Sequence, residues 1–173
     1  YERFASVAEE LWTEPVHRML DFFSEAFGEY PFAGEKYGHA MVSSALAYEH
    51  QTVTSYPEVY TFPGMGWLIA HELVHQWFGD LVTCRTWNHI WLNEGFATYF
   101  DYLFTEHDLG PVEFMVRNHK ARESYFKEDS TEYRRPIVAT YYENPEQMFD
   151  SHSYSKGSQV LHMLRYVLSD ELW

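Results

Sequence analysis

Cysteine, basic residues and long apolar runs are scarce in this 173-residue chain. Its only cysteine is Cys84, so an internal disulfide framework is excluded. Lys and Arg number 12 against 26 Asp and Glu, and the net charge of −14 argues against nucleic acid, whose phosphates require a basic surface. No stretch approaches the roughly 20 apolar residues that span a bilayer. With no repeat and no low-complexity segment, these absences favour an acidic globular protein that attracts cationic peptide termini.

The most informative segment that is present is His71-Glu72-Leu73-Val74-His75. Two histidines four residues apart share one face of a helix, so both imidazoles can bind one zinc ion. Glu72 is one step round that helix and can act as a general base without being a ligand. The alternative is a pair of surface histidines beside a solvated glutamate. The flanking residues are apolar on nearly all sides, which predicts a buried helix whose polar groups need partners.

Glu94, on a second predicted helix, would complete a His-His-Glu site and leave a fourth position open for water, as in catalytic zinc sites. A different class of zinc peptidase has Gly and a third His at fixed offsets after the second His. Those positions hold Phe78 and Leu81 here, so that class is excluded. The sequence therefore predicts one zinc ion per chain, bound by His71, His75 and Glu94, and peptide hydrolysis.

Four segments follow one another in the order and spacing of a known family, from about Tyr30 to the C-terminus. They are HELVHQWFGDLVT, WLNEGFATYF, the Ala47–Gln51 segment at the place of a Gly-Ala-Met-Glu-Asn motif, and the Phe149–Gly157 segment. In these segments the chain resembles the zinc aminopeptidases of the alanyl aminopeptidase (aminopeptidase N) group, which includes leukotriene hydrolase. The resemblance implies a thermolysin-like, gluzincin catalytic domain.

The resemblance also implies roles for two further residues. Tyr154 would donate a hydrogen bond to the oxyanion that forms at the scissile carbonyl, while Glu72 would move the proton. Asp101 lies seven residues after Glu94, two turns along the same stripe of a helix, where the family carries an acidic residue. A carboxylate there would accept the outer N–H of a zinc-bound histidine, and the alternative is a solvated helix acid.

The same resemblance implies that the Ala47–Gln51 segment selects the substrate. Glu49, with help from Glu94, would bind the free α-amine of a peptide, so that one residue is released at a time. Tyr48 replaces the family's Met and His50 its Asn, which changes the first side-chain pocket. The backbone from Ala45 through Ala47 to Tyr48 would pair with the substrate as an added strand.

The remaining histidines have no ligand spacing and are assigned no role: His17, His39, His89, His107, His119, His152 and His162. Cys84 is expected to be a small packed side chain.

Hydrophobic periodicity and turn residues predict an α+β fold, mostly helical, with a small sheet on the N-terminal side. Helices are expected over 5–27, 67–78, 92–106, 111–126 and 155–168, and Pro15 would kink or split the first of them. Short strands are expected over 39–44 and 45–54, and loops over 55–66 and 128–145.

The chain as a whole, residues 1–173, is expected to be one partial catalytic domain, because the sequence starts without Met and stops inside a helical pattern. The family implies a β-rich domain before this segment and a helical domain after it, so the isolated chain would bind zinc but have little or no activity. The cellular compartment stays open. Three alternatives also stay open: a thermolysin-type endopeptidase, an epoxide-hydrolase side activity, and a non-catalytic interaction module.

Overall fold

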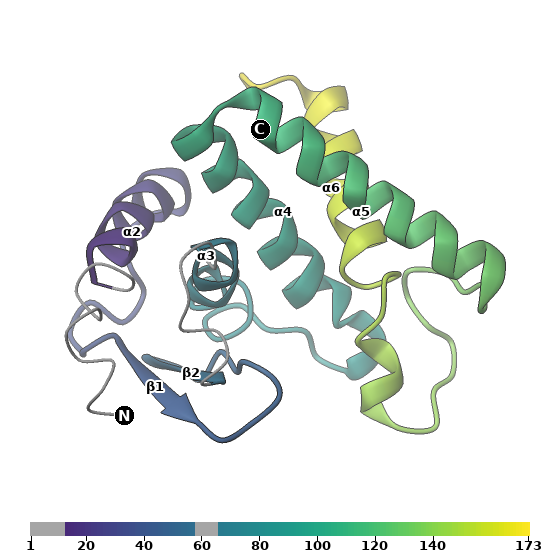
Figure 1. Ribbon diagram of the computed structural model, residues 1–173, viewed down its shortest axis with the longest axis horizontal. Helices are drawn as coiled ribbons and strands as arrows, with labels where there is room; N and C mark the ends of the chain where they lie inside the picture. Colours follow the sequence, from purple (N-terminus) through teal and green to yellow (C-terminus); the bar gives the residue numbers. More distant parts are fainter. Residues whose placement is uncertain (1–12, 58–65) are drawn as a thin grey trace. The chain divides into compact units, whose positions relative to one another are not determined.

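The computed structural model describes residues 13–57 and 66–173, and the chain divides into two compact units, residues 1–82 and 83–173. The described part is mostly helical and contains one small parallel sheet, in the element order drawn in Figure 1. The predicted α+β composition is therefore confirmed. The expectation of a single partial domain over 1–173 stays a prediction.

Helix α2 (Glu14–Phe27) opens the described part of the first unit. It buries Val16, Met19 and Phe23, whose spacing places them on one stripe. Pro15 lies in the first turn of α2, where its missing N–H costs no hydrogen bond, and the prediction that it kinks or splits a longer helix stays a prediction. The predicted helix is confirmed from Glu14 onward, and its residues 5–12 lie outside the described residues.

The sheet consists of β1 (Gly38–Val42) and β2 (Val53–Pro57), which run parallel with Gly38 opposite Val53. The first predicted strand is confirmed to within two residues at its C-terminal end. The second, over 45–54, is wrong: β2 begins only at Val53, and Tyr48 contributes a single antiparallel bridge to Ser55. Residues 54–57 are all buried, so β2 lacks the alternation by which a strand is recognised.

Helix α3 (Gly66–Val74) packs against α2 and carries the histidine motif. It ends one residue before His75, whereas the sequence predicted a helix to 78. After Val74 the backbone tightens into i→i+3 bonds, with the Trp77 amide donating to the Val74 carbonyl at 3.0 Å. The Trp77 indole then donates to the Gly28 carbonyl at 3.0 Å, which fixes the end of α3 to the end of α2.

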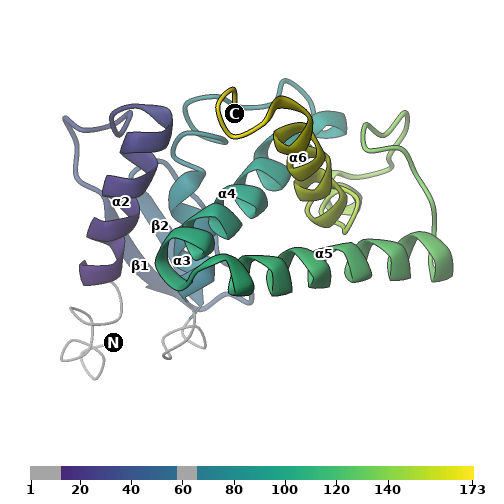
Figure 2. The ribbon, with the colours of Figure 1, turned by 90° about the horizontal axis from the view of Figure 1, so that it is seen from above.

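The second unit is built on α4 (Trp91–Leu109), α5 (Pro111–Thr131) and α6 (Ser155–Leu168), each of which packs on the other two, as Figures 1 and 2 show. Two short 3₁₀ helices, η4 (Trp87–His89) and η5 (Pro145–Met148), pack on each other. Cys84 packs beside the buried residues Ile90 and Met148, as predicted for a small apolar side chain.

Among the predicted helices of this unit, α6 is confirmed at both ends and α4 within three residues. Helix α5 is five residues longer than predicted. Its last turn is polar, and the Glu128 carbonyl there accepts from the N–H groups of Glu132 and Tyr133 at 3.0 and 3.2 Å, which satisfies one of the carbonyls at the helix end.

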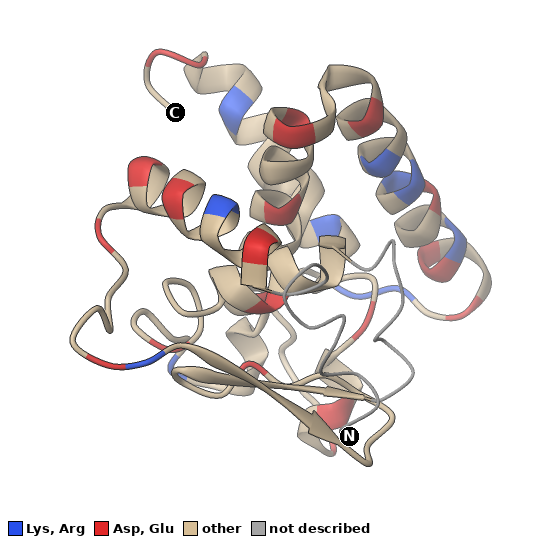
Figure 3. Cartoon of the chain, turned by 60° about the vertical axis from the view of Figure 1, so that its left-hand side comes forward, with Lys and Arg blue, Asp and Glu red and all other residues tan. Residues whose placement is uncertain are grey.

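Charge is unevenly distributed along the described elements. Figure 3 shows acidic residues on most helices, whereas several of the basic residues gather on α5. Across residues 13–57 and 66–173, no helix combines the length and the apolarity needed to cross a bilayer.

Candidate functional site

The two histidines of the motif face each other inside the first unit. The Nε2 atoms of His71 and His75 lie 3.3 Å apart, and His75 is 1% exposed. The Nδ1 atom of His75 lies 3.0 Å from the carbonyl oxygen of Phe78, which can only accept. Nδ1 therefore carries the proton and donates it, so Nε2 of neutral His75 presents a lone pair toward His71.

Gly79 makes this orientation possible. Its φ of +153° lies in the region that favours glycine, and a Cβ at this position would lie 2.9 Å from Nδ1 of His75. Any other residue would push against the imidazole. The glycine thus allows the chain to turn back and present the Phe78 carbonyl to His75.

The distance between the two imidazoles fits a shared tetrahedral metal. With Zn–N bonds of about 2.0–2.1 Å and a tetrahedral angle, two ligand nitrogens lie about 3.3–3.4 Å apart. The observed Nε2–Nε2 separation of 3.3 Å has this value. A buried pair of histidines with converging nitrogens is therefore preorganised for one cation.

Glu72 is also buried within the first unit, with 6% of its surface exposed. Burial raises the pKa of the Tyr56 phenol well above its usual range, and the neighbouring charges of Tyr37 and Glu72 raise it further. The Glu72 carboxylate thus lies near enough to the buried phenols of Tyr37 and Tyr56 for its charge to act on both.

The Ala47–Gln51 segment lies beside the end of α3. Gln76, two residues after the end of α3, donates to the His50 carbonyl at 3.3 Å, which holds the segment there. Burial raises the pKa of Asp80 to about 6, and the charge of Glu49 adds to this shift. The rings of Tyr48 and His50 stack, with centroids 5.8 Å apart and planes 14° apart. The two residues that replace the family's Met and Asn therefore form one aromatic surface.

The backbone of Tyr48 is already occupied. Its N–H donates to the Ser55 carbonyl and its carbonyl accepts from the Ser55 N–H, both at 2.9 Å. The expectation that the Tyr48 backbone pairs with a substrate strand is therefore wrong for this residue. Ala47, which is half-buried, keeps its predicted place in the pocket as a prediction.

In the second unit, Glu94 lies in the first turn of α4 and is 3% exposed. The next residue, Gly95, meets Gly157 of α6, and a Cβ on Gly157 would lie 2.8 Å from the Cα of Gly95. The two helices therefore touch backbone to backbone. Tyr154, immediately before α6, is held at a fixed place relative to Glu94 by this contact.

Asp101 has a strong partner within the second unit. Both carboxylate oxygens accept from the guanidinium of Arg117, at 2.6 and 2.5 Å, and Asp101 is 2% exposed. This bidentate pair links α4 to α5. The role predicted for Asp101 toward a zinc-bound histidine stays a prediction.

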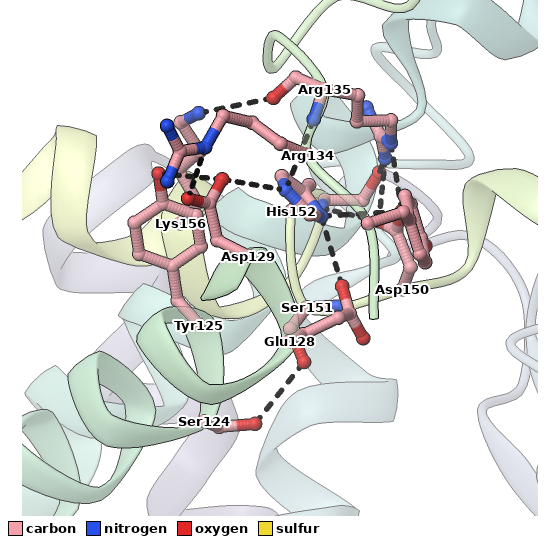
Figure 4. Close-up of polar contacts among 12 residues, drawn as sticks. Ser124, Tyr125, Glu128, Asp129, Arg134, Arg135, Asp150, Ser151, His152 and Lys156 are labelled. Atoms are coloured by element: carbon pink, nitrogen blue, oxygen red, sulfur yellow. Dashed lines mark hydrogen bonds and ion pairs between the residues drawn. The ribbon is translucent and has the colours of Figure 1, made fainter. Parts of the chain in front are cut away.

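The segment before Tyr154 is fixed by a buried cluster around His152, shown in Figure 4. His152 is fully buried, with Nδ1 2.9 Å from Glu128 and Nε2 3.2 Å from Asp129, both on the last turns of α5. Arg135 binds Asp150 through two nitrogens, at 2.7 and 2.5 Å. These contacts hold the 150–153 segment against α5.

Three members of this cluster, Glu128, Asp150 and His152, have ligand atoms close enough for a metal ion. The guanidinium of Arg135 already binds Asp150, and it helps to hold the pKa of that carboxyl below its usual value against the effect of burial. A cation is thus supplied by the protein itself, and we assign no metal to this cluster.

Two residues with large structural roles received none from the sequence. His152 has no ligand spacing, and Gln76 is only the residue after the motif. Both depend on partners more than 20 positions away in the chain, a relation that local spacing does not encode. Full burial of a polar side chain is the signal that identifies them.

Comparisons with known proteins agree with these features. The profile of the Peptidase family M1 domain matches residues 13–173. Aminopeptidase N of Homo sapiens is 41% identical over 112 residues, which are 61% of this chain and 12% of that protein. Glutamyl aminopeptidase of Sus scrofa is 40% identical over 109 residues, 60% of this chain and 11% of that protein. The matched region is thus a small part of these relatives.

Solved structures show the same fold. The M1 zinc metallopeptidase of Deinococcus radiodurans superposes with a TM-score of 0.72 at 35% identity, over 91% of this chain and 33% of that one. Yeast LTA4 hydrolase, in complex with bestatin, superposes with a TM-score of 0.74 at 24% identity, over 89% of this chain and 26% of that one. The family profile covers nearly the whole sequence, and the chain belongs to peptidase family M1.

Proposed function

We propose that this chain is the thermolysin-like catalytic domain of a zinc aminopeptidase. One zinc ion would be bound by His71, His75 and Glu94. The observation that carries the proposal is the 3.3 Å separation of the two imidazole nitrogens, the value expected for ligands of one tetrahedral metal. The burial of Glu94 on α4 and the membership of family M1 support the third ligand.

A bound zinc ion supplies Lewis acidity, which acidifies water and polarises a carbonyl oxygen. Within this frame Glu72 takes a proton from the attacking water and delivers it to the leaving amine. The Tyr154 hydroxyl donates a hydrogen bond to the oxyanion, and its position is set by the contact of Gly95 with Gly157. Asp101 would accept the outer N–H of a histidine ligand.

Peptides with a free N-terminus are the proposed substrates. Glu49 would pair with the α-ammonium group and leave no space for residues before it, so cleavage removes one residue at a time. The bond from Gln76 to the carbonyl of His50, the residue after Glu49, holds this segment beside the end of α3 and supports this role. Ala47 and the Tyr48 side chain would line the first side-chain pocket. A related M1 enzyme from Deinococcus radiodurans has been solved with a Tyr-Ser-Ala substrate, which supports a peptide as the ligand class.

The direct test uses the zinc-loaded full-length protein that contains this segment. We expect cleavage of an aminoacyl chromogenic amide and of unblocked peptides, with N-acetylated peptides left intact. Equal cleavage of acetylated peptides would instead identify a thermolysin-type endopeptidase, and zinc without any turnover would identify an interaction module.

The matched variant is Glu72→Gln, which keeps the shape of the side chain and removes its basicity. It should keep stoichiometric zinc and lose turnover by about 10²–10⁴-fold. Full activity in this variant would show that Glu72 is not the base.

The flanking domains implied by the resemblance also belong to the proposal. The 173 residues alone should bind zinc and hydrolyse the amide weakly or not at all. Full specific activity from this segment would contradict the idea that neighbouring domains complete the site.

A further inference from the structure

Gln76 is a fully buried polar side chain whose hydrogen-bonding capacity is completely used. Its Oε1 accepts from the Tyr30 hydroxyl at 3.1 Å and from the Thr52 N–H at 2.9 Å. Its Nε2 donates to the Asp80 carboxylate at 2.8 Å and to the His50 carbonyl at 3.3 Å. A side chain that only filled space would need none of these four bonds, since an apolar residue of the same volume would serve.

Two of the four bonds reach the segment that carries Glu49. Thr52 and His50 are 24 and 26 positions away from Gln76 in the sequence, and both are bound through their backbones. Gln76 itself directly follows His75. One carboxamide therefore joins the end of the histidine motif to the backbone next to Glu49.

The backbone of Thr52 is in an unusual conformation, which this clamp helps to maintain. Its φ of +63° lies in the left-handed region, which a β-branched residue rarely adopts. The Thr52 N–H is held by Gln76 and its carbonyl accepts from the Gly38 N–H at 2.9 Å. The Val53 N–H closes the turn on the His50 carbonyl at 3.0 Å. Strained backbone of this kind persists only where surrounding contacts determine it, and it concentrates at functional sites.

We propose that Gln76 is a positioning residue that fixes the distance between Glu49 and His75, and so couples recognition of the substrate amine to the metal site. The inference rests on the proposed function. Because Gln76 binds the backbone of His50 and Thr52 and follows His75 directly, loss of these two bonds lets the Glu49 segment move relative to the motif. The substrate's ammonium would then be bound at a poorly defined distance from the reacting carbonyl.

The test compares three variants of the zinc-loaded full-length protein. Gln76→Met keeps the volume and removes all four bonds. Gln76→Glu keeps the acceptor toward Thr52 and places an oxygen against the His50 carbonyl and the Asp80 carboxylate. Tyr30→Phe is the matched control, because it removes one bond of the same carboxamide without touching the 50–52 backbone.

We expect Gln76→Met and Gln76→Glu to raise KM for an aminoacyl amide about tenfold, with kcat changed much less and zinc still at one per chain. The preference for substrates with free over acetylated N-termini should fall as KM rises. Tyr30→Phe should keep the wild-type KM and preference. A purely structural Gln76 would lower thermal stability in all three variants and leave KM and preference unchanged, which would overturn the inference.

Amide hydrogen exchange supplies a second measurement that needs no folded variant. In the wild-type protein the Thr52 amide should exchange as slowly as the amides of α3, because its N–H is bound by a buried carboxamide. Rapid exchange at Thr52 would overturn the inference even where the variants fail to fold. A wild-type protein without zinc-dependent turnover would refute the proposed function, whereas an active wild type with unaltered Gln76 variants would refute only the coupling.

Discussion

Replacing Gly157 with alanine tests the backbone contact that joins the start of α4, which carries Glu94, to the start of α6, which follows Tyr154. The new Cβ would lie 2.8 Å from the Cα of Gly95, whereas carbon atoms in contact are about 3.5–4.0 Å apart. Both groups belong to helix backbones and cannot rotate away. Helices α4 and α6 would therefore have to separate by about 1 Å.

The magnitude follows from two opposing effects. Overpacking of a close contact costs about 1–3 kcal/mol, and the upper end applies because no side chain can yield. Alanine in a helix recovers about 1 kcal/mol relative to glycine. The net expectation is a loss of about 2 kcal/mol in the free energy of unfolding for Gly157→Ala.

The assay is denaturant unfolding, read together with activity at low temperature where the variant remains folded. A displacement near 1 Å between Glu94 and Tyr154 should reduce kcat by about 100-fold. Gly34→Ala is the control, since a Cβ at that position meets no described atom within 4 Å. Wild-type stability and kcat in Gly157→Ala would refute the contact as the element that positions Tyr154.

Three further predictions concern other parts of the chain. Arg135→Leu should lower the free energy of unfolding by about 3 kcal/mol, because Asp150 is left buried without its cation, and Arg135→Leu combined with Asp150→Leu should recover part of the loss in urea titrations. Burial lowers the pKa of His39 from 6.5 to about 4. Because His39 takes up its proton at a higher pH in the unfolded chain than in the folded one, the free energy of unfolding falls as the pH drops from 6.5 toward 4. In the metal-free His39→Phe variant, which keeps an aromatic ring, this fall in the free energy of unfolding between pH 6.5 and 4 should be smaller by on the order of 2 kcal/mol. The same fall in variant and wild type would show that His39 does not cause it. Tyr154→Phe should lower kcat by about 10²–10³-fold, while exposed Tyr141→Phe should leave it unchanged, and equal effects would exclude the oxyanion role.

The sequence predicts the helices of this fold better than its sheet. Helix α6 begins and ends where its apolar spacing indicates, since its inward face follows a regular stripe. Strand β2 could not be recognised, because Thr54 to Pro57 are buried on every side and show no alternation. Helix α5 extends past Phe126 because the carboxylates of Glu128 and Asp129 bind His152. His152 is more than 20 residues away in the sequence, so local helix propensity does not predict this contact.

Some features of the candidate site could likewise be predicted from the sequence and others could not. Spacing alone predicts that His71 and His75 converge, since residues four apart share a helix face, and their Nε2 atoms do lie 3.3 Å apart. Spacing does not reveal that His75 donates to Phe78, that Gly79 permits it, or that Gln76 is saturated with hydrogen bonds. Those features arise from turns and long-range contacts, which exist only once the chain has folded.

The central claim is tested most directly by an anomalous-scattering crystal structure of the zinc-loaded protein at the zinc absorption edge. We expect one strong peak about 2.0–2.2 Å from Nε2 of His71, Nε2 of His75 and a carboxylate oxygen of Glu94. A peak at another place, or three donors directed apart around an empty site in zinc-saturated crystals, would contradict it.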